Sequence, residues 1–195
     1  MKFSYIEKQH LLKAWVAISL AFAVLMGNII SLEFIIYFVI SLVTVGLGFL
    51  LHELAHKYVA QKYGCWAEFR ADDRMLIFAI LGALFFGFVF AAPGAVFIHG
   101  NVTKKKNGII SIAGPITNMI LAIAFFIPVF FYSVTGIVGI TLILGYRINA
   151  LIGLFNMIPF MNFDGAKIIK WSKPIYIATV IVSFMIYLPV VLGYV

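Results

Sequence analysis

Long apolar segments separated by short polar connections are the feature that most constrains how this chain folds. Each of six segments falls within or above the range of about 17 to 25 residues that a helix needs to cross a bilayer. They cover residues 14–30, 34–63, 75–92, 108–132, 136–158 and 174–195. A helix satisfies its own backbone hydrogen bonds in lipid, so the sequence predicts an all-α polytopic membrane protein.

Composition supports this fold class and excludes others. Hydrophobic residues make up 64% of the 195-residue chain and charged residues only 11%, which is not the composition of a water-soluble domain. The net charge of +7 comes from Lys and Arg residues scattered between apolar segments. We interpret them as topology signals and phospholipid contacts, and expect the lipid bilayer, not nucleic acid, as a partner. The single cysteine excludes an internal disulfide.

The distribution of charge predicts the topology. Residues 1–13 are basic and lead into an apolar segment with no evident cleavage site, so we expect an uncleaved first span in the cell membrane and a cytoplasmic N-terminus. If residues 75–92 crossed the membrane completely, the lysines at 104–106 would lie outside, against the positive-inside rule. We expect instead that they enter as a helix and return as a strand over 94–99. This arrangement has five full crossings and one hairpin, with the C-terminus outside.

The second apolar segment contains the sequence HELAH at residues 52–56. In a helix, His52 and His56 lie one turn apart on the same face, where their imidazoles can bind one Zn²⁺ ion. Glu53 lies beside them and is placed to take a proton from the attacking water. Two histidines do not complete a zinc site, so a third ligand has to come from elsewhere in the chain.

Asp164 is the predicted third ligand. It follows the proline that ends the fifth segment, on the same predicted side of the membrane as the histidines, and Gly165 can take the positive φ that turns a loop inward. Asp72 and Asp73 are alternatives by distance along the chain, but neighbouring carboxylates in a charged loop are usually solvated. Cys65 is a weaker alternative, because it has no cysteine partner.

The fourth segment carries a polar residue near its start. The sequence GPITN occupies residues 114–118, and Pro115 is expected in the first turn of the helix, where its missing N–H costs nothing. Asn118 needs a hydrogen-bond partner inside an apolar helix. Two interpretations stay open: Asn118 joins neighbouring helices, or it donates to a substrate carbonyl.

The returning strand is expected to line a cavity, because non-helical backbone at membrane depth is tolerated only against protein or water. An open strand edge can hold an extended peptide, so we expect this strand to bind substrate. The residues concerned are Gly94, Ala95, Val96, Phe97 and Ile98. Residues 66–72 alternate between apolar and polar side chains and are candidates for a second strand. We expect His10 and His99 to be solvated.

Taken in order, these sequences resemble the site-2 protease family of intramembrane metalloproteases. The resemblance rests on HELAH at 52–56, GPITN at 114–118, and NMIP at 156–159 leading to Asp-Gly at 164–165. It covers the catalytic core from about residue 34 to residue 170. Many members carry a PDZ or CBS domain, whereas residues 1–195 are expected to form a single transmembrane protease domain without either.

The resemblance implies a role for each matching residue. His52, His56 and Asp164 would bind zinc, and Glu53 would act first as general base and then as general acid. Asn118 would lie near the substrate carbonyl. The resemblance further implies that Asn156 helps to shape the site and contributes to substrate binding.

The sequence therefore predicts an intramembrane zinc metalloprotease that hydrolyses peptide bonds in or near transmembrane segments of other membrane proteins. A zinc peptidase of another class, acting on loops or prenylated tails, would need a glutamate ligand from a second helix, and Glu7, Glu33 and Glu68 are poorly placed for that role. A membrane zinc transporter or a non-catalytic zinc-dependent scaffold is the non-enzymatic alternative. Such a protein would not depend on the acid–base function of Glu53.

Overall fold

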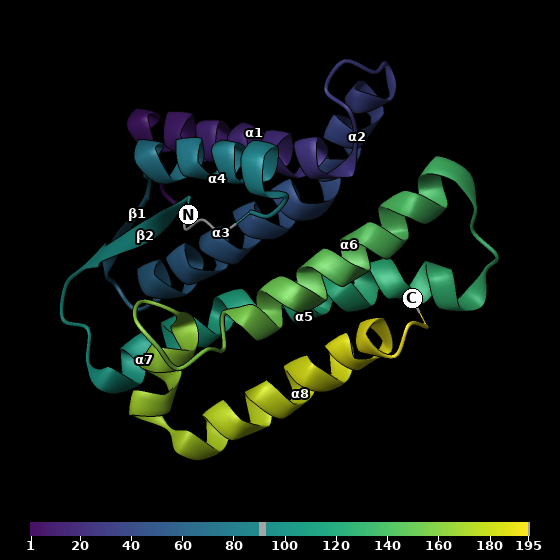
Figure 1. Ribbon diagram of the computed structural model, residues 1–195. Coiled ribbons are helices and arrows are strands. Elements are labelled where there is room, and N and C mark those ends of the chain that lie inside the picture. Colours follow the sequence, from purple (N-terminus) through teal and green to yellow (C-terminus); the bar gives the residue numbers. More distant parts are fainter. Residues whose placement is uncertain (90–92, 195) are drawn as a thin grey trace.

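The computed structural model describes residues 1–89 and 93–194 (Figure 1). Its elements are α1 (Tyr5–Met26), α2 (Glu33–Ser41), a π-helical turn (Leu42–Gly46), α3 (Leu47–Lys62), β1 (Trp66–Ala71), α4 (Asp73–Phe86), β2 (Gly94–His99), α5 (Lys104–Phe131), α6 (Gly136–Phe155), α7 (Asp164–Trp171) and α8 (Lys173–Val191). The two strands form a small antiparallel sheet. A mostly helical chain with one short hairpin confirms the predicted fold class.

Five helices in the described residues are long and apolar enough to cross a membrane, which makes this a multi-pass membrane protein. They are α1, the continuous helix formed by α2 and α3, α5, α6 and α8. In contrast, α4 has 14 residues, fewer than the about 20 that a crossing needs. After α4 the chain continues as β2, which is the order of elements expected for the hairpin. Residues 90–92 of the predicted segment lie outside the described part of the chain.

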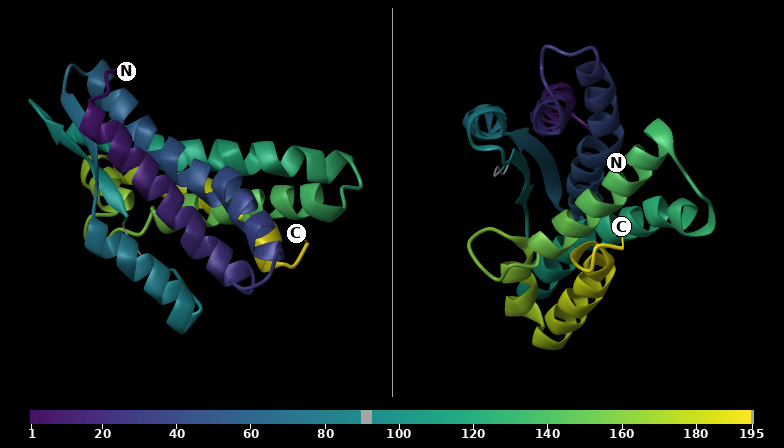
Figure 2. Two further views of the ribbon diagram at one scale, coloured as in Figure 1. Left: turned by 90° about the horizontal axis from the view of Figure 1, so that it is seen from above. Right: turned by 45° about the vertical axis from the view of Figure 1, so that its right-hand side comes forward.

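The helices form two groups that meet along α3. Figures 1 and 2 show α1 and α4 on one side of α3, and α5, α6 and α8 on the other. The sheet and α7 lie at the end of the molecule where α3 ends and α5 begins (Figure 1). Phe69 of β1 is fully buried and shares an apolar cluster with residues of α1 and α4. Its ring contacts that of Phe49 of α3 edge-on, with ring centroids 5.9 Å apart. The strands are therefore packed against the helix that carries the HELAH sequence.

The N-terminal helix is longer than predicted because its first turns pack against protein. The Ser4 hydroxyl caps α1 by accepting from the Glu7 N–H at 3.0 Å, so the helix begins nine residues before the apolar segment. His10, expected to be solvated, accepts a hydrogen bond from the Ala71 N–H of β1 through Nδ1 at 3.0 Å. That expectation was wrong for His10, whereas His99 is exposed, with its ring centroid 5.1 Å from that of Trp66.

Helix α5 also begins earlier than predicted. Thr103 caps it and accepts from the Lys106 N–H at 3.3 Å, so the helix includes all three lysines at 104–106. Pro115 consequently lies well inside the helix, and the prediction that it occupies the first turn was wrong. A proline is tolerated at such a position where neighbouring helices pack closely enough to compensate for the lost hydrogen bond.

A π-helical turn, Leu42–Gly46, interrupts the second span about two to three turns before His52. The Leu42 carbonyl accepts from the Leu47 N–H within this turn, and the Trp15 indole N–H of α1 also donates to it at 3.0 Å. Gly46 allows this approach, because a Cβ at that position would lie 2.2 Å from the Ser19 hydroxyl oxygen. α1 therefore packs closely on this turn, just before the part of the helix that carries HELAH.

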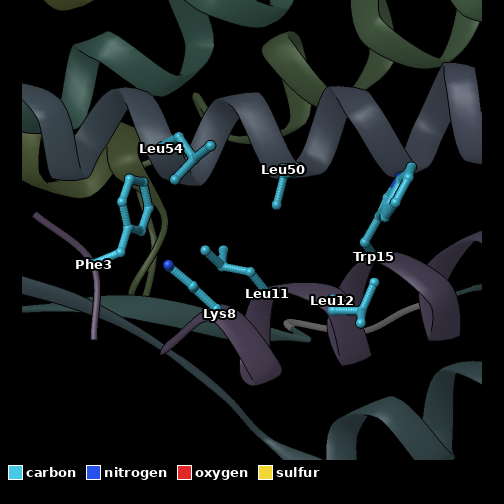
Figure 3. A pocket seen from close by; sticks show the side chains of 7 residues that line it. All are labelled: Phe3, Lys8, Leu11, Leu12, Trp15, Leu50 and Leu54. Carbon is cyan, nitrogen blue, oxygen red and sulfur yellow. The ribbon is translucent and has the colours of Figure 1, made fainter. Parts of the chain in front are cut away.

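An open apolar groove of about 310 Å³ lies between α1 and α3 (Figure 3). Leu11, Leu12 and Trp15 line it from α1, and Leu50 and Leu54 line it from α3. Figure 3 shows the two leucines of α3 pointing toward α1. The groove therefore lies on the side of α3 that packs against α1.

Replacing Gly46 by Ala tests the packing at the π-helical turn. The added methyl group meets Ser19 and Trp15, so we expect Gly46→Ala to lower the free energy of unfolding by about 1 to 3 kcal/mol. Gly153→Ala is the matched control, because a Cβ there meets its nearest neighbours at 3.5 Å, an ordinary contact distance. The measurement is denaturant-induced unfolding in detergent micelles. Equal stability of the two variants would contradict this account of the turn.

Candidate metal centre

The structure brings the three predicted metal ligands together. Nε2 of His52 and Nε2 of His56 lie 3.2 Å and 3.1 Å from the same carboxylate oxygen, Oδ2 of Asp164. All three side chains are buried, and the ligand atoms lie within 4.8 Å of one another. The histidines come from α3 and the aspartate from the start of α7. Two elements far apart in the chain thus form one cluster that can hold a metal ion.

Hydrogen bonds on the far side of each ring fix how the imidazoles face the cluster. Nδ1 of His56 lies 2.8 Å from the Ile110 carbonyl, and Nδ1 of His52 lies 2.5 Å from Oδ1 of Asn118. Both partners are oxygens that only accept, so each Nδ1 carries the proton. Each Nε2 therefore faces the cluster, and Nε2 is the atom whose lone pair binds a metal in the neutral imidazole.

Asn118 is fully buried and uses its whole amide group inside the protein. Its NH₂ group donates to the Gly48 carbonyl at 3.2 Å and to Oδ1 of Asn149 at 2.9 Å, while its oxygen accepts from His52. Its two N–H donors are thus directed to protein acceptors rather than to a substrate carbonyl. Of the two interpretations left open, this geometry favours the one in which Asn118 joins helices, and it orients His52.

Asn149 is a residue whose role the sequence did not reveal. It is fully buried on α6, and its NH₂ group donates to the Gly145 carbonyl at 2.9 Å. Its oxygen supports Asn118, which in turn supports His52. The signal in the sequence was a lone amide in an apolar span, but nothing in the pattern identified its partner.

Gly114 leaves the space toward which the two imidazoles point. A Cβ at this position would lie 2.5 Å from Nε2 of His52 and 2.5 Å from Nε2 of His56. The glycine before Pro115 is therefore required by close approach to the cluster rather than by the start of a helix. Two neutral imidazoles and one carboxylate around a space without a side chain fit Zn²⁺, whose usual ligands are nitrogen, sulfur and carboxylate oxygen.

Asp164 is held at the cluster by the loop between α6 and α7. The Gly165 N–H donates to the Asn156 carbonyl at 2.8 Å, and a Cβ on Gly165 would lie 2.2 Å from the Met157 oxygen. Gly165 does not have a positive φ, so the predicted reason for this glycine was wrong: close packing requires it. The residue with positive φ in this loop is Met161, at 48°.

Asn156 acts on this loop. It ends α6, and its side chain donates to the Ile152 carbonyl at 2.9 Å while its own carbonyl accepts from Gly165. These contacts agree with a role in shaping the site. They give its side chain a partner within α6, and a direct contact with substrate stays a prediction.

The electrostatics of the cluster favour a bound cation. Burial alone would raise the pKa of the Asp164 carboxyl, but the neighbouring His56 and His52 outweigh burial and hold this pKa well below its usual range. Asp164 is therefore ionised at neutral pH and supplies a negative charge. Its second oxygen, Oδ1, lies 3.4 Å from Nζ of Lys167 one turn further along α7.

Glu53 differs from the three ligands in its surroundings. Glu53 follows His52 directly on α3, and its side chain is half-buried. Among the described residues it makes no hydrogen bond or ion pair of its own. A carboxylate in this position is available to a water molecule at the cluster.

The alternative ligands have other roles. Asp72 caps α4 by accepting from the backbone N–H groups of Arg74 and Met75. Asp73 is exposed and pairs with Lys13 of α1, whose hydrogen bond lowers the pKa of the Asp73 carboxyl. Cys65 is buried in an apolar cluster beside the sheet. None of these three belongs to the cluster formed by His52, His56 and Asp164.

Comparison with known proteins finds relatives named for metal-dependent proteolysis. The chain is 42% identical over 157 residues to the protein named putative zinc metalloprotease MJ0611 of Methanocaldococcus jannaschii, an alignment that covers 79% of this chain and 82% of that protein. It is 30% identical over 162 residues to the protein named putative zinc metalloprotease YwhC of Bacillus subtilis, covering 71% of this chain and 69% of the relative.

A third relative, zinc metalloprotease MJ0392 of Methanocaldococcus jannaschii, is 29% identical over 136 residues, covering 69% of this chain and 34% of that protein. No protein-family model and no solved structure matches the chain. The cluster of two histidines and an aspartate agrees with the zinc that all three relatives carry in their names. With 42% identity to MJ0611 over most of both sequences, the chain belongs to this family of zinc metalloproteases.

Proposed function

We propose that this protein is an intramembrane zinc endopeptidase of the site-2 protease type, which hydrolyses peptide bonds in or near the transmembrane segments of other membrane proteins. The observation that carries the proposal is the position of the metal cluster. Its two histidines lie on a helix long and apolar enough to span a membrane, and the cluster is buried among further such helices. A peptidase built in this way acts on segments that are themselves in the membrane.

Each residue at the cluster has a separate role in the proposed reaction. His52, His56 and Asp164 would hold the zinc ion, and three protein ligands leave a fourth position open. Zinc, when bound, supplies a Lewis acid that polarises the scissile carbonyl and makes water more acidic. Glu53 takes the proton from the attacking water and delivers it to the leaving amine. Asn118 keeps His52 oriented through these steps.

The free edge of β2 is the surface proposed to bind substrate. Phe69 of β1 is opposite Val96 of β2, and the Phe69 N–H points away from β2 toward α1. In an antiparallel pair, the residue opposite such a position also directs its N–H and C=O outward. By this register the backbone groups of Gly94, Val96 and Ile98 lie on the outer edge of the sheet. They are available to an added strand.

This edge lies close to the metal cluster. Val96 and Ile98 pack in one apolar cluster with Ile110, the residue whose carbonyl accepts the hydrogen bond of His56. Ala95 and Phe97 have exposed side chains on the opposite face of the strand. A transmembrane substrate has to unwind before its peptide bonds can be attacked, and pairing with β2 would replace the hydrogen bonds that its helix loses.

The proposed orientation places the metal cluster toward the cytoplasmic side of a cell membrane. The lysines at 104–106 begin α5, and Lys167 and Lys170 lie on α7, which packs against α5. Figure 1 shows these elements at the same end of the molecule as the N-terminus of the chain. By the positive-inside rule, this basic end, including the N-terminus, faces the cytoplasm and contacts anionic lipid head groups.

Replacing Glu53 by Gln tests the catalytic claim. Loss of the proton acceptor should lower cleavage of a model transmembrane substrate at least about a hundredfold, while bound zinc stays at the wild-type level. The assay uses the purified protein in liposomes, with cleavage products identified by mass spectrometry. Glu33→Gln, which removes an exposed carboxylate at the start of α2, is the control and should cleave normally.

Equal cleavage by wild type and Glu53→Gln would refute the proposed function. If zinc flux into liposomes were found and survived Glu53→Gln, the protein would be a transporter instead.

Metal content tests the ligand set independently of activity. Wild-type protein should bind about one zinc ion per chain, whereas Asp164→Asn and Gly114→Ala should each bind little. Asp164→Asn removes the anionic ligand, and the methyl group of Gly114→Ala occupies the space between the imidazoles. The measurement is elemental analysis of protein with a wild-type circular dichroism spectrum. Asp73→Asn and Gly153→Ala are the matched controls, and zinc loss in either control would count against this assignment of the site.

A further inference from the structure

A buried ion pair lies next to the metal-binding helix, and no step of the proposed reaction uses it. Glu7 of α1 and Lys57 of α3 pair with each other, with 0% and 1% of their surfaces exposed. Lys57 directly follows His56 in the chain. Removing two charges from water costs several kcal/mol per ion, so such a pair does not by itself stabilise a fold. Its contacts indicate a different role.

The carboxylate of Glu7 joins three elements. Oε2 accepts from the Lys57 ammonium group of α3, and Oε1 accepts from the Phe69 N–H of β1 at 2.9 Å. Both oxygens of one side chain on α1 are thus used, one for the metal-binding helix and one for the sheet. This bridge and the ring contact between Phe69 and Phe49 both link β1 to α3.

Neighbouring residues close the rest of the same edge of β1. His10, three residues after Glu7 and on the same face of α1, accepts from the Ala71 N–H. The Gln61 side chain donates to the Ala67 carbonyl at 3.4 Å. With Phe69 bound to Glu7, side chains of α1 and α3 engage a backbone group at each of the three outward-facing residues of β1. Of the two edges of the sheet in the described residues, β2 therefore presents the one open to an added strand.

We propose that Glu7 is a positioning residue for substrate binding, which holds the sheet against α3 so that a segment paired with β2 lies at the metal centre. The inference rests on the proposed function. A hairpin of two strands is marginally stable by itself, so its placement has to come from its contacts with the helices, and β1 makes those with α1. If the sheet lost this support, the β2 edge would hold a paired segment less firmly, and substrate binding would weaken.

The chemistry of glutamine makes Glu7→Gln an informative variant. Its side chain has one accepting oxygen, so it can satisfy either the Phe69 N–H or Lys57, while its NH₂ group faces the other donor. Removing the buried cation at the same time relieves this conflict. In Glu7→Gln/Lys57→Met, the amide oxygen is free to accept from the Phe69 N–H, and the sheet should return to its place.

The experiment compares wild-type protein, Glu7→Gln and the double variant, all loaded with zinc in liposomes. For Glu7→Gln we expect KM for a transmembrane substrate to rise about tenfold, the effect of losing one charge-assisted hydrogen bond, with kcat and zinc content unchanged. The double variant should recover the wild-type KM. Backbone hydrogen exchange over residues 66–71 should be faster in Glu7→Gln and normal again in the double variant.

Lys13→Met is the matched control. It removes another lysine that pairs α1 with a distant carboxylate, Asp73, which lies on α4 and not on a strand. Its KM should equal that of the wild type. A merely structural role of Glu7 predicts parallel losses of zinc, kcat and stability with no recovery in the double variant, and that result would overturn the inference.

An unchanged KM in Glu7→Gln would also overturn the inference, while the proposed function would stand on the cleavage by wild type. If zinc-loaded wild type cleaved no substrate, the proposed function would fail, and the positioning role of Glu7 with it.

Discussion

The protein depends on three ligand atoms that meet in a space too small for an added side chain. Nε2 of His52 and of His56 lie within 3.2 Å of one oxygen of Asp164, and a methyl group at Gly114 would displace both rings. Carbonyl oxygens on the far side of each ring accept from Nδ1 and turn Nε2 toward the cluster. The cluster is therefore organised for a cation by its surroundings before any cation binds.

The rest of the fold arranges access to this cluster. One side of α3 packs against α5, which contributes the Ile110 carbonyl, Gly114 and Asn118 to the cluster. The other side carries α1 and the sheet, linked by the buried pair of Glu7 and Lys57. The same apolar cluster that holds β2 in place also contains Ile110. The proposed substrate edge and the metal site are thus joined through shared packing.

Three predictions from the sequence were wrong. Pro115 was placed in a first turn, but α5 begins earlier because Thr103 caps it. Gly165 was given a positive φ and His10 was expected to be solvated, but Gly165 packs on the Met157 carbonyl across the loop and His10 binds β1. A local pattern reports the conformations a residue favours and contains no information about a distant neighbour.

The sequence by itself determined the membrane-spanning architecture, the two strands near α3 and the placement of His52 and His56 on one face of that helix. These follow from apolar length, alternation and the spacing of two histidines on one helical face, which are properties of continuous segments. Only the tertiary structure decided that Asp164 reaches the histidines, that Asn118 and Asn149 orient His52, and that α1 closes one edge of the sheet. Those facts depend on the packing of helices against one another, and packing is set by the whole chain rather than by any one segment.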